Sequence, residues 1–181
     1  MSILHLVVAP NPILQEKSLP VSEITEEIQK LCNDMLETMY HFHGIGLSAV
    51  QVGILKRIIV VDINWTENKK TEINQKFQDP FIMINPKIIE NSQKDNTYNE
   101  GCLSFPDQFV KITRPKSITI EYLDINGLQH EIKADGLFAT CIQHELDHLD
   151  GITISSYISP LKRTMMINKT KKIKKNMQNV I

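Results

Sequence analysis

The chain has 181 residues, the size of one ordinary domain with a full hydrophobic core. It is 41% hydrophobic and 23% charged and has three cysteines, which excludes fibrous and disulfide-rich proteins. The formal net charge of -1 gives no overall attraction to nucleic acids or to membranes. We therefore expect a single domain over residues 1–181 that acts as an enzyme or as a binding module.

The N-terminal segment MSILHLVVAPNPIL lacks the features of a targeting peptide. It has no basic region and no small-residue cleavage site, and no run in the chain approaches about 18 apolar residues. The cysteines, Cys32, Cys102 and Cys141, are odd in number, which favours free thiols in a reducing compartment. These features predict a cytoplasmic protein without membrane contact.

The opening of the chain predicts a short strand or an extended arm followed by a loop, because prolines interrupt its apolar run. A helix is predicted over 25–41. Its apolar residues recur at spacings of three and four, Thr25 precedes it as a cap, and two glutamates occupy its first turn.

Strands are predicted where β-branched residues gather between polar loops, at 54–63 and at 80–89. The polar segment 65–79 between them predicts an exposed, mobile loop. The segments 117–123 and 128–134 predict a hairpin, because Asn126-Gly127 between them readily adopts the positive φ angles of tight turns.

Two further helices are predicted. One follows Asp135 as a cap and runs to residue 149 or 150, where Gly151 suits the left-handed C-terminal position. The other is a basic C-terminal helix over 161–178, which has seven Lys or Arg residues and no acid. Together the elements predict an α+β fold with mostly antiparallel strands around a central helix, and with an N-terminal and a C-terminal helix.

The central helix contains the pattern His-Glu-x-x-His. Residues four apart share a helix face, so His144 and His148 can both reach one metal ion while Glu145 lies beside them. A lone histidine on an apolar face is usually a core residue, but two at this spacing around a glutamate indicate a metal site. The pattern is typical of a metal-dependent hydrolase.

A catalytic metal site usually has three protein ligands and one open position, so a third ligand is needed. Cys141 lies seven residues before His148, about 10.5 Å along a helix at 1.5 Å per residue, which is too far for one ion. Cys32 falls in the apolar register of the first helix. Cys102, next to Gly101, is the best thiolate candidate, although a buried strand cysteine is the alternative.

Three segments, HGIGLSAVQVG (43–53), EGCLS (100–104) and QHELDH (143–148), resemble in order and spacing the signature segments of the bacterial peptide deformylases. The likeness runs from APNPIL to SPLK and covers nearly the whole chain. It departs at Ser48, where many members have a small apolar residue, and in the long 65–79 segment. The resemblance implies metal ligands Cys102, His144 and His148, a catalytic carboxylate Glu145, oxyanion donors Gln51 and the Leu103 backbone N–H, and substrate-binding residues Ile45, Gly46 and Gly101.

The resemblance also implies the reaction. It is hydrolysis of the N-formyl group from the initiator methionine of new polypeptides, with release of formate. The implied cofactor is one divalent metal ion, Fe²⁺ as the native ion, with Zn²⁺, Ni²⁺ or Co²⁺ also able to bind. The expected partners are N-formylmethionyl peptides.

Three competing interpretations remain. A zincin-type endopeptidase shares His-Glu-x-x-His but usually takes its third ligand downstream, where this chain offers only Asp150.

The GIGLSA segment at 44–49 matches a dinucleotide-binding pattern. It follows a helix instead of a strand, however, so no nucleotide cofactor is expected. Gly44 and Gly46 would instead admit a substrate backbone. A nucleic-acid-binding role for the basic C-terminal helix would leave the metal structural. A weak ribosome contact of this helix fits an enzyme too, although most lysine-rich helices are simply solvated.

Overall fold

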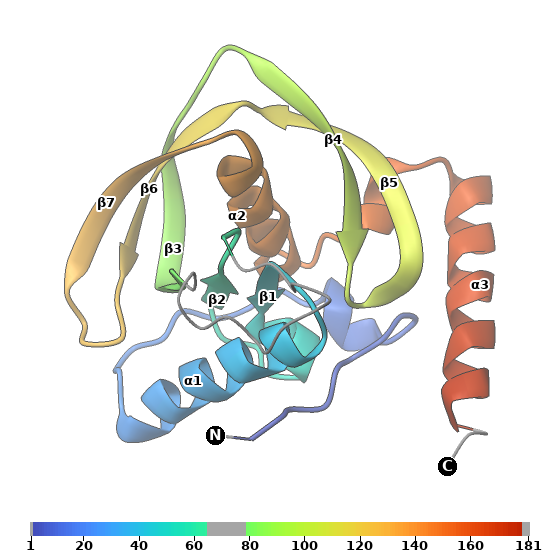
Figure 1. Ribbon diagram of the computed structural model, residues 1–181, viewed down its shortest axis with the longest axis horizontal. Coiled ribbons are helices and arrows are strands. Elements are labelled where there is room, and N and C mark those ends of the chain that lie inside the picture. Colours follow the sequence, from blue (N-terminus) through green and yellow to red (C-terminus); the bar gives the residue numbers. More distant parts are fainter. Residues whose placement is uncertain (1, 65–78, 179–181) are drawn as a thin grey trace, which may run out of the picture.

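Residues 2–64 and 79–178 are described by the computed structural model, shown in Figure 1. The predicted 65–79 loop therefore lies almost wholly outside the described residues. The helices are α1 (Glu26–His41), α2 (Gly136–Leu149) and α3 (Pro160–Gln178), with short 3-10 helices η1 (Pro12–Gln15), η2 (Ala49–Val52) and η4 (Ile154–Tyr157). The strands are β1 (Gly46–Ser48), β2 (Ile58–Val61), β3 (Phe81–Asn91), β4 (Asp95–Cys102), β5 (Phe105–Pro115), β6 (Ser117–Leu123) and β7 (Gln129–Asp135).

The strands form two antiparallel sheets. Five strands pair in the order β1-β2-β3-β6-β7, and β4 pairs with β5 alone. Helix α2 lies between these two layers, with α1 beneath the larger sheet and α3 outside β5 (Figure 1). The predicted α+β class, with mostly antiparallel strands around the metal-motif helix, is confirmed.

Strand β2 lies between the two main hydrophobic clusters of the core and contributes alternate side chains to each of them. Ile59 and Val61 face α2 and pack with Ile142 and Leu149, while the side chains at Ile58 and Val60 pack toward α1. Because successive strand residues point to opposite faces, a strand buried on both faces is apolar throughout. All four β2 residues are fully buried. Helix α2 is thereby fixed against the large sheet.

The predicted helix over 25–41 is confirmed as α1, whose cap is Thr25: its hydroxyl accepts a hydrogen bond from the Ile28 N–H. The hairpin is confirmed as β6–β7. Its turn differs in detail, since only Gly127 has a positive φ, of 81°. The Asp124 carboxylate holds the turn instead, by accepting hydrogen bonds from the N–H groups of Asn126 and Leu128.

The N-terminal segment, predicted as a short strand or an extended arm, is an extended arm tied to the fold by backbone bonds from Val7 to Gln51 and from Ala9 to Ser104. Asp135 has the extended backbone of a helix cap, but its side chain makes no capping hydrogen bond to α2. Gly151 has a φ of 75°, as predicted for the C-terminal position.

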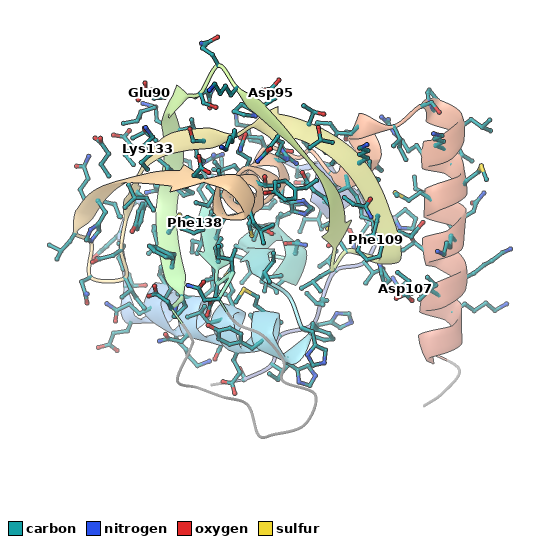
Figure 2. The ribbon with its side chains drawn as sticks, turned by 45° about the horizontal axis from the view of Figure 1, so that its top comes forward. Glu90, Asp95, Asp107, Phe109, Lys133 and Phe138 are labelled. Carbon is teal, nitrogen blue, oxygen red and sulfur yellow. The ribbon has the colours of Figure 1, made fainter. Side chains whose placement is uncertain are left out.

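The β4–β5 hairpin is absent from the sequence prediction. Strand β4 is polar and mostly exposed, so its pattern lacks the apolar alternation of a typical strand. Asp107 and Phe109 lie toward the tip of this hairpin, on the side of α3 (Figure 2). The hairpin matters for the site because Cys102 ends β4, where the strand register shifts after Gly101.

Candidate metal centre

Three potential ligands converge where the end of β4 meets α2. Cys102 Sγ lies 3.1 Å from His148 Nε2, and the ligand atoms of Cys102, His144 and His148 all lie within 4.8 Å of one another. Both histidines are buried and project from one side of α2, four residues apart. One thiolate and two imidazoles form a donor set suited to Zn²⁺ and to Fe²⁺, Ni²⁺ or Co²⁺.

The other two cysteines are not part of this group. Cys141 Sγ points to the Ile45 carbonyl oxygen, 3.4 Å away, and burial raises the pKa of the Cys141 thiol well above its ordinary value. Cys32 is fully buried under the sheet, where desolvation raises its pKa to about 12. Neither thiol loses its proton readily, and among the three cysteines only Cys102 lies in the group with the two histidines.

Glu145 lies beside the three ligands and is itself buried. Desolvation raises the pKa of its carboxyl group to about 7, against the opposing effect of His144. Its Oε2 atom has no hydrogen-bond partner among the described residues, and the same is true of His148 Nδ1. The carboxylate does have a hydrogen bond with the Ser48 side chain, so only one of its oxygens is left over. A buried polar atom without a partner is costly, and a metal ion with its water would satisfy it.

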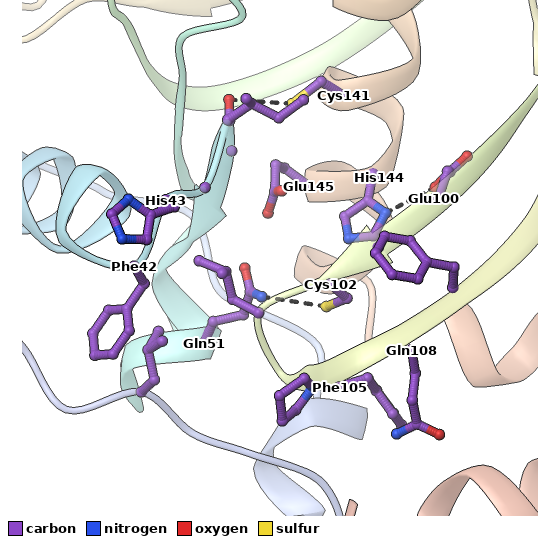
Figure 3. Close-up of a pocket in the computed structure, with 18 of the residues that line it drawn as sticks. Phe42, His43, Gln51, Glu100, Cys102, Phe105, Gln108, Cys141, His144 and Glu145 are labelled. Carbon is purple, nitrogen blue, oxygen red and sulfur yellow. Dashed lines mark hydrogen bonds and ion pairs between the residues drawn. The ribbon is translucent and has the colours of Figure 1, made fainter. Parts of the chain in front are cut away.

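His144 is oriented by a carboxylate that the sequence interpretation missed. Its Nδ1 is 2.8 Å from Glu100 Oε2, so Nε2 is left to face Cys102 and His148. Figure 3 marks the contact between His144 and Glu100. Burial alone would raise the pKa of Glu100, but hydrogen bonds from His144 and Arg114 outweigh it and hold that pKa below its ordinary value. Burial lowers the pKa of His148 well below its usual range, which keeps this imidazole neutral for metal binding.

Gln51 presents its amide N–H groups to the same site. Its Oε1 accepts hydrogen bonds from the backbone N–H and from the hydroxyl of Ser48, each at 2.9 Å. Its Nε2 therefore points to Cys102 Sγ at 3.5 Å and to Ser104 Oγ at 3.3 Å. Figure 3 shows the contact between Gln51 and Cys102. Ser48, which departs from the family pattern, thus fixes the rotamer of Gln51 through an additional hydrogen bond.

A cavity of about 1050 Å³ opens onto the ligands. Its walls include every predicted site residue except His148, namely Ile45, Gly46, Gln51, Gly101, Cys102, Leu103, His144 and Glu145. The rim carries exposed apolar side chains, among them Phe42, Phe109 and Leu137. A mostly apolar cavity with a few converging polar groups is the usual form of a small-molecule or peptide site.

The glycines around the cavity have a role in packing that the sequence interpretation did not foresee. A Cβ atom on Gly46 would lie 2.6 Å from Glu145 Oε1 and 2.7 Å from Cys141 Sγ. A Cβ on Gly101 would lie 2.8 Å from the Phe109 ring. Both distances are too short for real contacts. Glu145 and Cys141 are buried and cannot move aside, so residue 46 needs glycine whether or not a substrate approaches, whereas the exposed Phe109 ring could shift away from a larger residue at 101.

A family model described as polypeptide deformylase matches residues 3–164. The chain belongs to this family. A peptide deformylase of Pelagibacter ubique is 47% identical over 176 residues, covering 97% of this chain and 98% of that protein. The crystal structure of peptide deformylase from Ehrlichia chaffeensis has a TM-score of 0.87 at 43% identity and covers 96% of this chain and 97% of that one. The same enzyme in complex with actinonin also has a TM-score of 0.87, at 44% identity, covering 95% of this chain and 98% of that one.

Family membership confirms the predicted reaction. Peptide deformylases are metal-dependent hydrolases that remove the N-formyl group from nascent peptides, and formylated peptides are therefore the partners of this chain. None of the helices in the described part of the chain has the length and apolar character needed to cross a bilayer.

The choice between the two cysteines near the site can be tested directly. We expect Cys102→Ala to lose its metal on purification, because two imidazoles alone leave a three-ligand site incomplete. Cys141→Ala is the matched control and should retain one ion per chain, since its thiol only approaches the Ile45 carbonyl. Elemental analysis of both variants gives the result. Stoichiometric metal in Cys102→Ala would contradict the assignment.

Proposed function

We propose that Cys102, His144 and His148 hold one divalent ion and that Glu145 handles the protons of the deformylation reaction. The observation that carries this proposal is the convergence of the three ligand atoms within 4.8 Å beside a buried carboxylate oxygen without a hydrogen-bond partner among the described residues. A bound divalent cation lowers the pKa of its water from 15.7 toward about 7 and polarises the formyl oxygen.

Glu145 is the group suited to move the proton. Its pKa of about 7 lets the carboxylate accept a proton from the attacking water and return it to the departing amine at neutral pH. Such acid–base catalysis typically contributes about 10²- to 10⁴-fold to the rate. Burial among apolar and ligand side chains also keeps bulk water from competing for that proton.

The negative charge that develops on the formyl oxygen needs donors fixed in advance. We assign this role to the Gln51 amide and to the Leu103 backbone N–H. Ser48 supports it, because its two hydrogen bonds to Oε1 fix the amide so that the N–H groups of Gln51, and not its carbonyl oxygen, face the formyl oxygen. The loss of one such donor typically lowers turnover about 10²- to 10³-fold.

The substrate backbone would run between two strand edges. Strand β1 lies at the end of the five-stranded sheet, and β4 pairs only with β5 within the described residues. Both edges reach the cavity, where Ile45, Gly46 and Gly101 line its walls. An extended peptide can add to such edges through its own N–H and C=O groups. This arrangement explains how many peptide sequences could be accepted behind one formyl-methionine.

A zincin-type endopeptidase is less consistent with the geometry. The thiolate that joins the two histidines comes from Cys102, far upstream, and Asp150 lies past the end of α2, in contact with Arg57. The third ligand that such endopeptidases usually take downstream of the motif therefore has no counterpart in the described group.

Helix α3 supports a second, accessory proposal, contact with ribosomal RNA. It packs against the β5 side of the molecule through Met166 and Thr170, while Lys171, Lys172 and Lys175 are exposed. Lysine side chains bind phosphates without reading sequence. An enzyme acting on emerging chains would gain from such docking, and the same location agrees with a cytoplasmic enzyme whose cysteine ligand must stay reduced.

The reaction is tested by formate release from a formyl-Met tripeptide, with anaerobically prepared, metal-loaded protein. We expect release that a chelator abolishes. Glu145→Gln should keep its metal yet lose turnover by about 10²- to 10⁴-fold, because the amide cannot accept the water proton. Glu131→Gln, an exposed change on β7, is the matched control and should react normally. An active Glu145→Gln enzyme, or internal cleavage of unformylated peptides, would refute the proposal.

The identity of the ion is a separate question. We propose Fe²⁺ as the native ion, because imidazole and thiolate donors accept it and metal availability often decides occupancy in such a site. Protein purified without oxygen should therefore contain mainly iron, and zinc should replace it after exposure to air. Elemental analysis of the two preparations, alongside formate release, makes this comparison. Zinc in the anaerobic preparation at full activity would contradict it.

The ribosome contact is tested by salt-dependent co-sedimentation. Replacing Lys171, Lys172 and Lys175 with Gln should weaken binding and flatten its salt dependence, by about one unit of slope for each phosphate that the helix no longer neutralises. A control with Lys111, Lys116 and Lys133 changed to Gln removes the same charge from exposed strand positions and their connections. Equal binding by the two triple variants would show that α3 is only a solvated face.

A further inference from the structure

The two metal-binding imidazoles have unequal support from the protein. His144 Nδ1 meets Glu100 Oε2 at 2.8 Å, whereas His148 Nδ1 is buried and has no hydrogen-bond partner among the described residues. A group behind a ligating histidine fixes its ring orientation and its basicity. Within the described chain, the orientation of the His144 imidazole therefore depends on Glu100.

Glu100 is in turn held by Arg114. Arg114 Nε donates to Oε1 at 2.7 Å and its Nη2 donates to Oε2 at 3.0 Å, a two-point contact between side chains that are both almost fully buried. The remaining nitrogen, Nη1, donates to Asp147 Oδ2 at 2.8 Å. Because a guanidinium group is a rigid plane, two carboxylates on different sides fix its rotation as well as its position.

Asp147 is held by the hydroxyl of Tyr157, from the 3-10 helix η4. The Tyr157 O–H donates to Asp147 Oδ2 at 2.7 Å, and the ring lies under the Arg114 guanidinium, 5.2 Å from its carbon to the ring centroid. Asp147 and Tyr157 line a second cavity of about 900 Å³ that contains none of the three ligands. Tyr157 does not line the substrate cavity, so it can influence the reaction only through this chain of contacts.

We propose that Tyr157 is a positioning residue for the metal centre, which fixes His144 through Asp147, Arg114 and Glu100. The inference rests on the proposed metal site and goes beyond it, because it assigns a role to a side chain on the far side of α2. Without the hydroxyl, Asp147 keeps only its bond to Arg114, and the guanidinium plane is less firmly fixed. Glu100 and His144 then sample orientations that bind the ion less well.

Tyr157→Phe removes only the hydroxyl and keeps the ring under the guanidinium. We expect a chelator to take the metal about 10-fold faster from this variant, the lower end of the range for groups that support a ligand. The visible absorption spectrum of the Co²⁺-loaded protein should change, because it reports the geometry of the ligands. The kcat for the formyl-Met tripeptide should fall while KM stays unchanged, since Tyr157 does not line the substrate cavity.

Tyr40→Phe is the matched control. Tyr40 also donates its hydroxyl to a carboxylate, Asp62 Oδ2, at 2.7 Å, but from α1 on the other side of the large sheet. Both variants lose a tyrosine–aspartate hydrogen bond and should destabilise the metal-free fold to a similar degree. Only Tyr157→Phe should alter metal loss and the Co²⁺ spectrum. Equal metal-loss rates in the two variants would overturn the proposal.

A double-variant cycle tests the route of the effect. If Tyr157 acts through Asp147, adding Tyr157→Phe to Asp147→Asn should not accelerate metal loss further, because the two residues form one unit. Additive effects would refute the route.

Metal loss is measured without substrate, so it is independent of deformylation. A wild-type protein that retains metal and releases no formate would overturn the proposed function alone, and normal formate release with unaltered metal loss in Tyr157→Phe would overturn only this inference.

Discussion

Helix α2 buries three ionisable side chains of the site, His144, Glu145 and His148, and the surrounding structure satisfies most of their polar atoms. A polar group without a partner in such a place typically costs a few kcal/mol, and an isolated charge costs more. His144 contacts Glu100, and Glu100 forms a buried ion pair with Arg114. Removing one partner of such a pair typically costs about 3–5 kcal/mol of stability. The atoms left without protein partners in the described structure include Glu145 Oε2 and His148 Nδ1, both within or next to the group of Cys102, His144 and His148.

The need to give buried polar groups partners also explains why the site is assembled from distant segments. A helix can present two imidazoles four residues apart, but its own Cys141 lies about one turn before His144 and two turns before His148, and its thiol points to the Ile45 carbonyl oxygen. The thiol nearest the two imidazoles comes from another element, because the β4–β5 hairpin curves over α2 and places Cys102 beside His144 and His148 (Figure 1). Gly46 completes the arrangement, since any larger residue would push into Glu145.

The sequence predicted the parts of the fold that have a local signal. Helix α1 and the β6–β7 hairpin follow from apolar periodicity, a Thr cap and a Gly turn. Strand β4 has no such signal, because it is polar and gains its order by pairing with β5. Glu100 was missed for the same reason: its partners are Arg114 on β5 and His144 on α2, and no local pattern relates them. A general expectation could have found it, since a ligating histidine usually has a carboxylate or carbonyl behind it.

Helix α3 was predicted from its charge, yet its contacts link it to the site in a way that charge alone does not reveal. Gln108 Nε2 donates to Thr170 Oγ1 at 2.6 Å, and Lys169 Nζ donates to the Asp107 carbonyl at 2.9 Å. Asp107 and Gln108 also line the substrate cavity, beside Phe109. The helix therefore supports a cavity wall through Lys169, Thr170 and Lys174 and exposes Lys171, Lys172 and Lys175 to solvent. Deleting α3 would alter the cavity wall and remove the exposed lysines at the same time. Substitution of the exposed lysines alone changes the surface charge and leaves the shape of the cavity as it is.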